Sequence, residues 1–173
     1  GPRRDDRRRG GGDLTMGVSL DREPILAALA ARLRARCPRL KDVSRRYRSP
    51  SQVEPGEKPV AIVAVGTQTP VVRRGAPNLW TLQIPVYVYV RADEASSSVA
   101  PGTLINALVK EVEDALERDT ATEAPRDISE LYSTNLGLPN VFSCRVTSVE
   151  TDEGLLDPDG LAVLVVQVEA APG

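Results

Sequence analysis

Apolar residues alternate with other residues over the segment from Trp80 to Val90, WTLQIPVYVYV. A period of two places the two sets of side chains on opposite faces of a β-strand. One face carries Trp80, Leu82, Ile84, Val86, Val88 and Val90, and the other carries Thr81, Gln83, Pro85, Tyr87 and Tyr89. Proline cannot donate a hydrogen bond to a neighbouring strand, so the pattern predicts a strand that lies at a sheet edge or is bulged at Pro85.

Two other segments repeat their apolar residues at helical spacing, which predicts two helices that each bury one face. The first extends from an N-cap at Asp21 to Arg36, with arginines in its last turns, and Pro38 ends it. The second covers Pro101 to Arg118, with its acidic residues facing water. The first apolar stripe is Ile25, Leu26, Leu29, Ala30 and Leu33, and the second is Leu104, Ile105, Leu108, Val112, Ala115 and Leu116.

Shorter apolar runs predict the remaining strands, and polar runs predict the loops between them. A polar insertion over residues 67–78 predicts a long hairpin or loop, and the irregular stretch over residues 119–140 is long enough for a contact loop. The other expected strands are Val43–Tyr47, Val60–Val65, Val141–Thr151 and Leu161–Ala170. This order of elements predicts an α+β fold: a mostly antiparallel sheet of four to five strands, two helices packed on one face, and extended loops or a hairpin.

The chain has 173 residues, the size of a single domain. Residues 1–18 are rich in arginine, aspartate and glycine and lack apolar periodicity, so we expect a flexible charged arm there and one domain over residues 19–173. The alternative is a basic arm that becomes ordered against a partner or nucleic acid. Residues 1–48 carry a net charge of +8, and residues 49–173 carry −10. With opposite charges of this kind the first part could bind a polyanion, or copies of the chain could bind one another. We favour the second, because six of the early arginines lie on or just after the first predicted helix.

The composition disfavours catalysis. The chain has no histidine, which removes the commonest general base and most zinc or iron sites. The segment Asp157–Gly160 faintly resembles a calcium loop, but Val166 stands where such a loop requires glutamate. The acidic residues of the second helix are interpreted as a solvated face, since nothing nearby in the sequence would raise a pKa. We therefore expect no metal, no cofactor and no enzymatic activity.

The cysteines and the distribution of apolar residues indicate an intracellular setting. Cys37 and Cys144 are expected to be buried free thiols, with a disulfide across the long intervening loop as the alternative. No apolar run approaches the about 20 residues that a membrane span needs, and the N-terminus lacks the apolar core of a secretory signal. We expect a protein that makes no membrane contact and is assembled inside a cell.

Two clusters of side chains are candidates for contacts with other proteins. Arg45, Arg46 and Arg48 surround Tyr47 in a basic patch. Without a recognition motif, this patch indicates surface charge or a protein contact rather than nucleic-acid binding. Tyr87 and Tyr89 lie on the strand face opposite the core. They are covered either by a loop of the same chain or by another subunit, because tyrosine combines apolar area with a polar tip.

Several segments together resemble the small tail terminator and tail completion proteins of long-tailed phages and related tail-like particles. The resemblance covers roughly residues 20–170 and consists of patterns of fold and turn. It is carried by the opening helix and by Val43–Arg48, Pro77–Val90, Ala100–Leu116 and Val149–Val168. The resemblance implies an α+β protomer that closes into a hexameric ring at the head-proximal end of the tail tube. Such a ring stops tube polymerisation, belongs to the virion and has no catalytic residues.

The partners implied by the resemblance are further copies of the chain, the tail tube protein and the connector or stopper protein of the head. Genomic DNA would pass through the lumen without specific binding, so we expect mostly acidic charge there. Arg73 and Arg74, ahead of the tyrosine strand, are expected to reach the adjacent subunit or the tube. Together with Arg45, Arg46, Tyr87 and Tyr89 they form the candidate interface.

Other functions compete with this interpretation. Within the same class, the chain could be a head-tail stopper or the tail tube protein itself, which would polymerise into long tubes rather than discrete rings. From other classes, a small enzyme would need carboxylate or serine chemistry that the sequence does not display. A small DNA-binding module would rest on the arm and on the basic residues near Tyr47.

Overall fold

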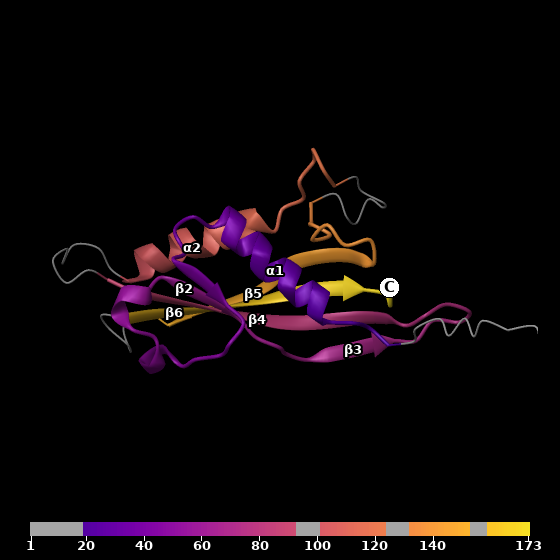
Figure 1. The fold of residues 1–173 in the computed structure, drawn as a ribbon, viewed down its shortest axis with the longest axis horizontal. Helices are drawn as coiled ribbons and strands as arrows, with labels where there is room; N and C mark the ends of the chain where they lie inside the picture. Colours follow the sequence, from indigo (N-terminus) through magenta and orange to yellow (C-terminus); the bar gives the residue numbers. More distant parts are fainter. Residues whose placement is uncertain (1–18, 93–100, 124–131, 153–158) are drawn as a thin grey trace, which may run out of the picture.

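The computed structural model describes residues 19–92, 101–123, 132–152 and 159–173. Within them, two helices lie on one side of a six-stranded sheet (Figure 1). The expected arm over residues 1–18 lies outside the described residues. The helices are α1 (Glu23–Arg36) and α2 (Pro101–Ala115), and the strands are β1 (Asp42–Ser44), β2 (Val60–Val63), β3 (Gln68–Val71), β4 (Leu79–Arg91), β5 (Val141–Asp152) and β6 (Asp159–Ala170).

The sheet is built around β4. Its order is β1-β2-β4-β6-β5, and β3 pairs with β4 on the side of β2. The β4–β6 pairing is antiparallel over the full length of both strands, from Trp80 opposite Ala170 to Arg91 opposite Asp159. Every other pair is antiparallel except β1 with β2. The α+β class is confirmed, with six strands instead of four to five because the polar insertion forms β3 as one arm of a hairpin.

Several expected boundaries differ from the structure. The first helix starts at Glu23, whose N–H donates to the Asp21 carboxylate over 3.3 Å. The first strand ends at Ser44, where the chain turns and Ser44 Oγ accepts from the Arg46 N–H over 3.1 Å. The second strand ends at Val63. Helix α2 ends at Ala115, because the following backbone tightens into three-residue turns rather than reaching residue 118.

The expectation that the tyrosine strand lies at an edge or is bulged was wrong. Strand β4 is central, and its register with β6 is unbroken at Pro85, which lies opposite Val165. The carbonyl of Pro85 accepts from the Ala64 N–H over 3.0 Å, so its ring nitrogen faces the same side. On that side β2 has ended and β3 has not begun. The proline therefore sits where the neighbouring strand is interrupted and no donor is needed.

The core lies between the helices and the covered face of the sheet. Both predicted helical stripes are confirmed as part of it, with only Leu104 partly exposed. From β4 and β6 the core takes Leu82, Ile84, Val86, Val88, Val90, Ala162, Leu164, Val166, Val168 and Ala170. Cys37 and Cys144 are both buried and free, as expected, so no disulfide joins them. Burial raises the pKa of each thiol to about 12.

A buried network around Arg32 joins the helices to the loop that follows α2. The Arg32 guanidinium pairs with Glu123 over 3.0 Å and donates to the carbonyls of Ala115 and Glu117, each over 2.6 Å. Thr134 donates to the same Glu123 carboxylate over 2.6 Å. Arginines at the end of α1 were expected to complement that helix's own dipole. Arg32 instead binds the last carbonyl of α2, at Ala115, and a carbonyl just beyond it, at Glu117.

We expect Gly66→Ala to destabilise the fold by about 3 kcal/mol through overpacking against backbone. A Cβ at Gly66 would lie 2.0 Å from the Gln83 carbonyl oxygen and 2.9 Å from Pro85 Cδ. The matched control is Gly56→Ala, because a Cβ there meets nothing within 4 Å. Urea unfolding should show a change of less than about 1 kcal/mol for the control. Equal effects of the two substitutions would contradict the close packing of Gly66.

Arg32→Ala should lower the free energy of unfolding by about 3 kcal/mol, because it leaves the Glu123 carboxylate buried without its partner. The control is Arg36→Ala, which removes an ion pair with Asp119 that is more than a quarter exposed on both sides. Loss of such an exposed pair costs less than about 1 kcal/mol. Chemical denaturation of the two variants measures the difference, and a mild effect of Arg32→Ala would rule out the anchoring role.

Candidate interaction surface

The β3–β4 hairpin extends beyond the helices at one end of the sheet (Figure 1). Its base is fixed to the start of α1, where the Arg22 guanidinium lies 4.9 Å from the centre of the Trp80 ring and Nε donates to Gln68 Oε1. At its tip, Val71 and Val72 are 48% and 82% exposed. The hairpin is therefore an anchored projection with an apolar end.

Arg73 and Arg74 follow these valines and are also exposed. The Arg73 guanidinium donates twice to the Pro77 carbonyl, over 2.9 Å and 2.7 Å, which closes the hairpin loop. Within the described residues neither arginine makes an ion pair, so the tip presents two cations beside two apolar side chains. The conformation of this loop is tied to its own backbone and not to the body of the domain.

Tyr89 lies beneath a loop of its own chain, one of the two alternatives that the sequence left open. Its side chain is 1% exposed, packs against Val53 and donates to the Arg48 carbonyl over 2.7 Å. The covering segment carries two short 3₁₀ helices, Pro50–Gln52 and Pro55–Glu57. Burial, with a smaller contribution from neighbouring Tyr47, raises the pKa of the Tyr89 phenol well above its usual range.

Tyr87 and the basic patch adjoin the same loop. The ring of Tyr87 meets Tyr47 edge to face, with centroids 5.3 Å apart, and Tyr47 is 57% exposed. Arg45 forms an ion pair with Glu23 over 2.9 Å, whereas Arg46 is exposed and makes no ion pair among the described residues. The structure thus groups Tyr87, Tyr89, Arg45 and Arg46 at one place. The two hairpin arginines lie near the opposite end of β4.

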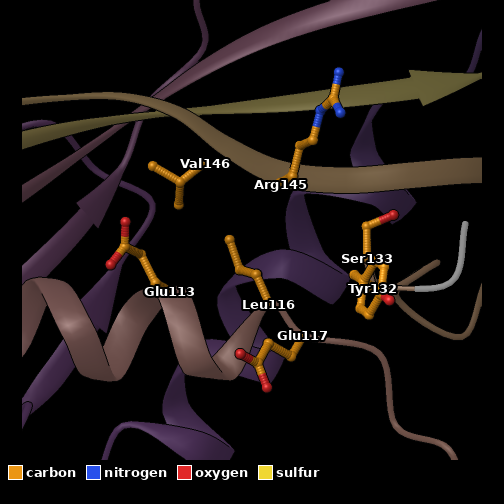
Figure 2. Close-up of a pocket in the computed structure, with 7 residues that line it drawn as sticks. All are labelled: Glu113, Leu116, Glu117, Tyr132, Ser133, Arg145 and Val146. Carbon is orange, nitrogen blue, oxygen red and sulfur yellow. The ribbon is translucent and has the colours of Figure 1, made fainter. Parts of the chain in front are cut away.

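A cavity of about 290 Å³ lies between the end of α2 and strand β5 (Figure 2). Leu116 and Val146 face the space between the two elements, and the Arg145 guanidinium points away from α2. Tyr132, which is 85% exposed, stands at one end of the cavity. The lining residues are Glu113, Leu116, Glu117, Tyr132, Ser133, Arg145 and Val146.

The acidic side of this cavity is formed by Glu113, in the last turn of α2, and Glu117, two residues beyond the end of the helix. Both carboxylates are exposed, and neither makes an ion pair in the described part of the chain. The nearby Lys110 instead forms an ion pair with Asp114 over 2.6 Å. The Ser133 hydroxyl is buried and has no hydrogen-bond partner among these residues. The rim is acidic on the α2 side, and Arg145 on the β5 side points its guanidinium away from α2. The α2 side, with its apolar floor, can therefore accept a cationic side chain that has apolar neighbours.

Sequence reasoning missed this cavity and treated its carboxylates as part of a uniform solvated face. That interpretation was wrong for Glu111, whose side chain is only 17% exposed and pairs with Arg39 over 3.4 Å. The available signal was the pair of carboxylates four residues apart, Glu113 and Glu117, at the end of the predicted helix. The β5 and Tyr132 walls have no such signal, because they come from distant parts of the chain.

The described residues show little that could support chemistry. They contain no group of three histidine, cysteine, aspartate or glutamate residues placed to hold a metal ion. Of the weak calcium-loop candidate, Asp157 and Pro158 lie outside the described residues, and Asp159 pairs with Lys58 over 3.0 Å. No helix in the described ranges is both long and apolar enough to span a membrane.

Comparison with known proteins identifies a family. The family model described as Bacteriophage Tail Tube Terminator Protein matches residues 41–173, which include the whole sheet and α2. No curated protein matches the chain. A chain in the solved virion of a native gene transfer agent (GTA) particle is similar, with 15% identity and a TM-score of 0.48, over 85% of this chain and 94% of that one. Functional conclusions therefore depend on the family match.

Tyr89→Phe should lower stability by about 1 kcal/mol at neutral pH, through loss of the hydrogen bond to Arg48. Because the folded protein holds the phenol proton more tightly than the unfolded chain, the wild type loses stability as pH rises above about 10. The variant lacks this loss, so its deficit should shrink at alkaline pH. Urea unfolding at pH 7 and pH 10.5 measures both values. The control Tyr132→Phe changes an exposed hydroxyl and should alter neither, and a constant Tyr89→Phe deficit would contradict the assignment.

Proposed function

This chain belongs to the bacteriophage tail tube terminator protein family, and from that premise we propose that it ends tail tube growth by closing into a ring at the head-proximal end. The family makes the chain a structural protein of the virion tail. The match over residues 41–173 is the observation that carries the proposal. Termination requires a protomer that binds the tube end on one side and presents no acceptor for another tube subunit on the other.

The arrangement of surfaces supports assembly into a ring. A ring is built from heterologous contacts, in which one patch meets a different patch on the neighbour and the rotation closes. This protomer offers distinct features at its two sheet edges: the projecting hairpin of β3 on one side and the long β5 strand with its acidic cavity on the other. A C2 dimer would instead require one self-complementary patch.

The proposed partners are further copies of the chain, forming a hexamer, then the tail tube protein and the connector or stopper of the head. Arg45, Arg46, Arg73, Arg74 and Tyr87 are proposed to lie at these contacts. Tyr89 would contribute indirectly, by holding the loop that bears the basic patch. DNA would pass without specific binding through a lumen whose charge comes mostly from residues 49–173, with their net charge of −10.

The test is to add the purified protein to growing tubes of its cognate tail tube protein and to measure tube lengths by electron microscopy. We expect tubes to stop elongating with one six-membered ring at a single end, and no change in length when the protein is replaced by buffer. The protein alone should form no long tubes. Long tubes of this chain would identify it as a tube component, and unlimited growth in its presence would contradict termination.

A further inference from the structure

We propose that the tip of the β3–β4 hairpin of one protomer docks into the acidic cavity between α2 and β5 of the next copy. This inference rests on the proposed ring and names the contact that would build it. The occupant is a second copy of this chain, because the two surfaces complement each other in charge and in apolar character. The tip consists of Val71, Val72, Arg73 and Arg74, and the cavity is the one shown in Figure 2.

Charge complementarity is the first argument. Glu113 lies in the last turn of α2 and Glu117 lies two residues beyond its end, and both carboxylates border the cavity. Like charges beside one cavity repel each other, and a cation placed between them removes that repulsion. No arginine or lysine of the described chain is paired with either carboxylate. Arg74 is exposed and equally lacks an ion pair, and Arg73 is hydrogen-bonded only to the Pro77 carbonyl. A guanidinium fits a carboxylate through two parallel hydrogen bonds, so two arginines match two glutamates.

Apolar contact is the second argument. Val72 is 82% exposed, the most of any aliphatic residue described. Removing its apolar surface from water at an interface would be favourable. The cavity floor offers Leu116 and Val146 as apolar partners. At its end, the exposed ring of Tyr132 can stack on an arginine of the tip. The two valines of the tip would thus contact the apolar floor, and the two arginines that follow them would contact the carboxylates at its border.

The positions of the two surfaces decide between contact within one chain and contact between chains. Strand β3 lies at the β2 side of β4, and the cavity lies beside β5, the strand at the opposite edge of the sheet. A protomer cannot fold its own hairpin across β4 and β6 to reach the cavity while that hairpin is paired with β4 and anchored by Arg22. The contact therefore joins two chains, and in the proposed ring each copy offers its tip to one neighbour and its cavity to another.

The cavity is held in shape independently of any partner. Arg32 binds the carbonyl of Glu117, and Glu123 binds Arg32, Thr134 and the N–H of Asp119. Glu117 and Ser133 are bridged through their backbones in the same region. Docking into a preformed cavity avoids the ordering cost that a flexible receptor would incur.

A charge exchange tests the contact in the tube-capping reaction. Arg73→Glu with Arg74→Glu, and separately Glu113→Arg with Glu117→Arg, should each weaken ring formation at least about tenfold, because like charges then face each other. All four substitutions in one chain should restore it. Lys41→Glu is the control, an exposed cation outside the tip, the cavity and the proposed contacts, and it should leave ring symmetry unchanged. Thermal unfolding of each variant shows whether the protomer still folds.

Cross-linking gives a second measurement that does not depend on charge. Val72→Cys combined with Glu113→Cys should yield covalent ladders of two or more chains when assembled rings are oxidised, whereas each single variant should yield none beyond a dimer. Cys37 and Cys144 stay silent because both are buried. Absence of ladders from intact double-variant rings would overturn the docking.

The outcomes separate the contact from the ring itself. Rings that form and cap tubes equally well in every charge variant would overturn the docking and leave termination intact. A wild-type protein that forms no rings on tubes would overturn both. Loss of rings on changing the cavity but not the hairpin would give the cavity another occupant, such as the arginine-rich residues 1–18, and would also overturn the docking.

Discussion

The largely buried guanidinium of Arg32 is the constraint on which the segment between α2 and β5 depends. It joins α1 to the carbonyls at and just beyond the end of α2 and, through Glu123, to the segment that leads into β5. A buried ion pair adds little net stability, since desolvation offsets the attraction, but removing one partner is costly. Its effect here is to favour one arrangement of the chain after α2 over others. It holds the segment after α2, because the Glu117 carbonyl and the Glu123 carboxylate bind the same guanidinium and Glu117 is bridged to Ser133.

A second constraint creates the projecting hairpin. Strand β2 ends at Val63 because Gly66 must pass against the Gln83 carbonyl and the ring of Pro85, where no Cβ fits. The chain stays tied to β4 at this crossing, through Ala64 N–H to the Pro85 carbonyl and Gln83 N–H to the Thr67 carbonyl. It then resumes as β3 beside the first residues of β4. The contact between Gly66 and Pro85 thus divides the chain beside β4 into two strands, the buried β2 and the projecting β3.

Local periodicity predicted the elements that local sequence controls, and it failed where the decisive neighbour is distant in sequence. Both helical stripes and the alternation from Leu82 to Val90 report burial directly, so they were predictable. The sequence pattern wrongly predicted an edge or a bulge at Pro85. The neighbouring strand is interrupted there, where Gly66 packs against the proline, and the pattern within one strand contains no information about its neighbour. Tyr89 could be narrowed only to two alternatives, since the loop that covers it begins some forty residues earlier. The cavity was invisible for the same reason: its walls come from α2, the segment at Tyr132 and β5.

The charge asymmetry of the sequence has a different meaning once the ion pairs are known. A positive first part and a negative remainder suggested attraction between copies, yet Arg32, Arg36, Arg39 and Arg48 all pair with carboxylates from beyond residue 48 within one protomer. Many of the opposite charges of the two segments therefore pair within one protomer. For this reason, the net charge of a segment is a poor guide to contacts between copies. The informative charges are those left over. Arg73 and Arg74 lie in the acidic part of the sequence, and Glu113 and Glu117 have no counterion among the described residues. Folding neutralises what it brings together, so the charges that remain exposed and unpaired are the ones available to select a neighbour.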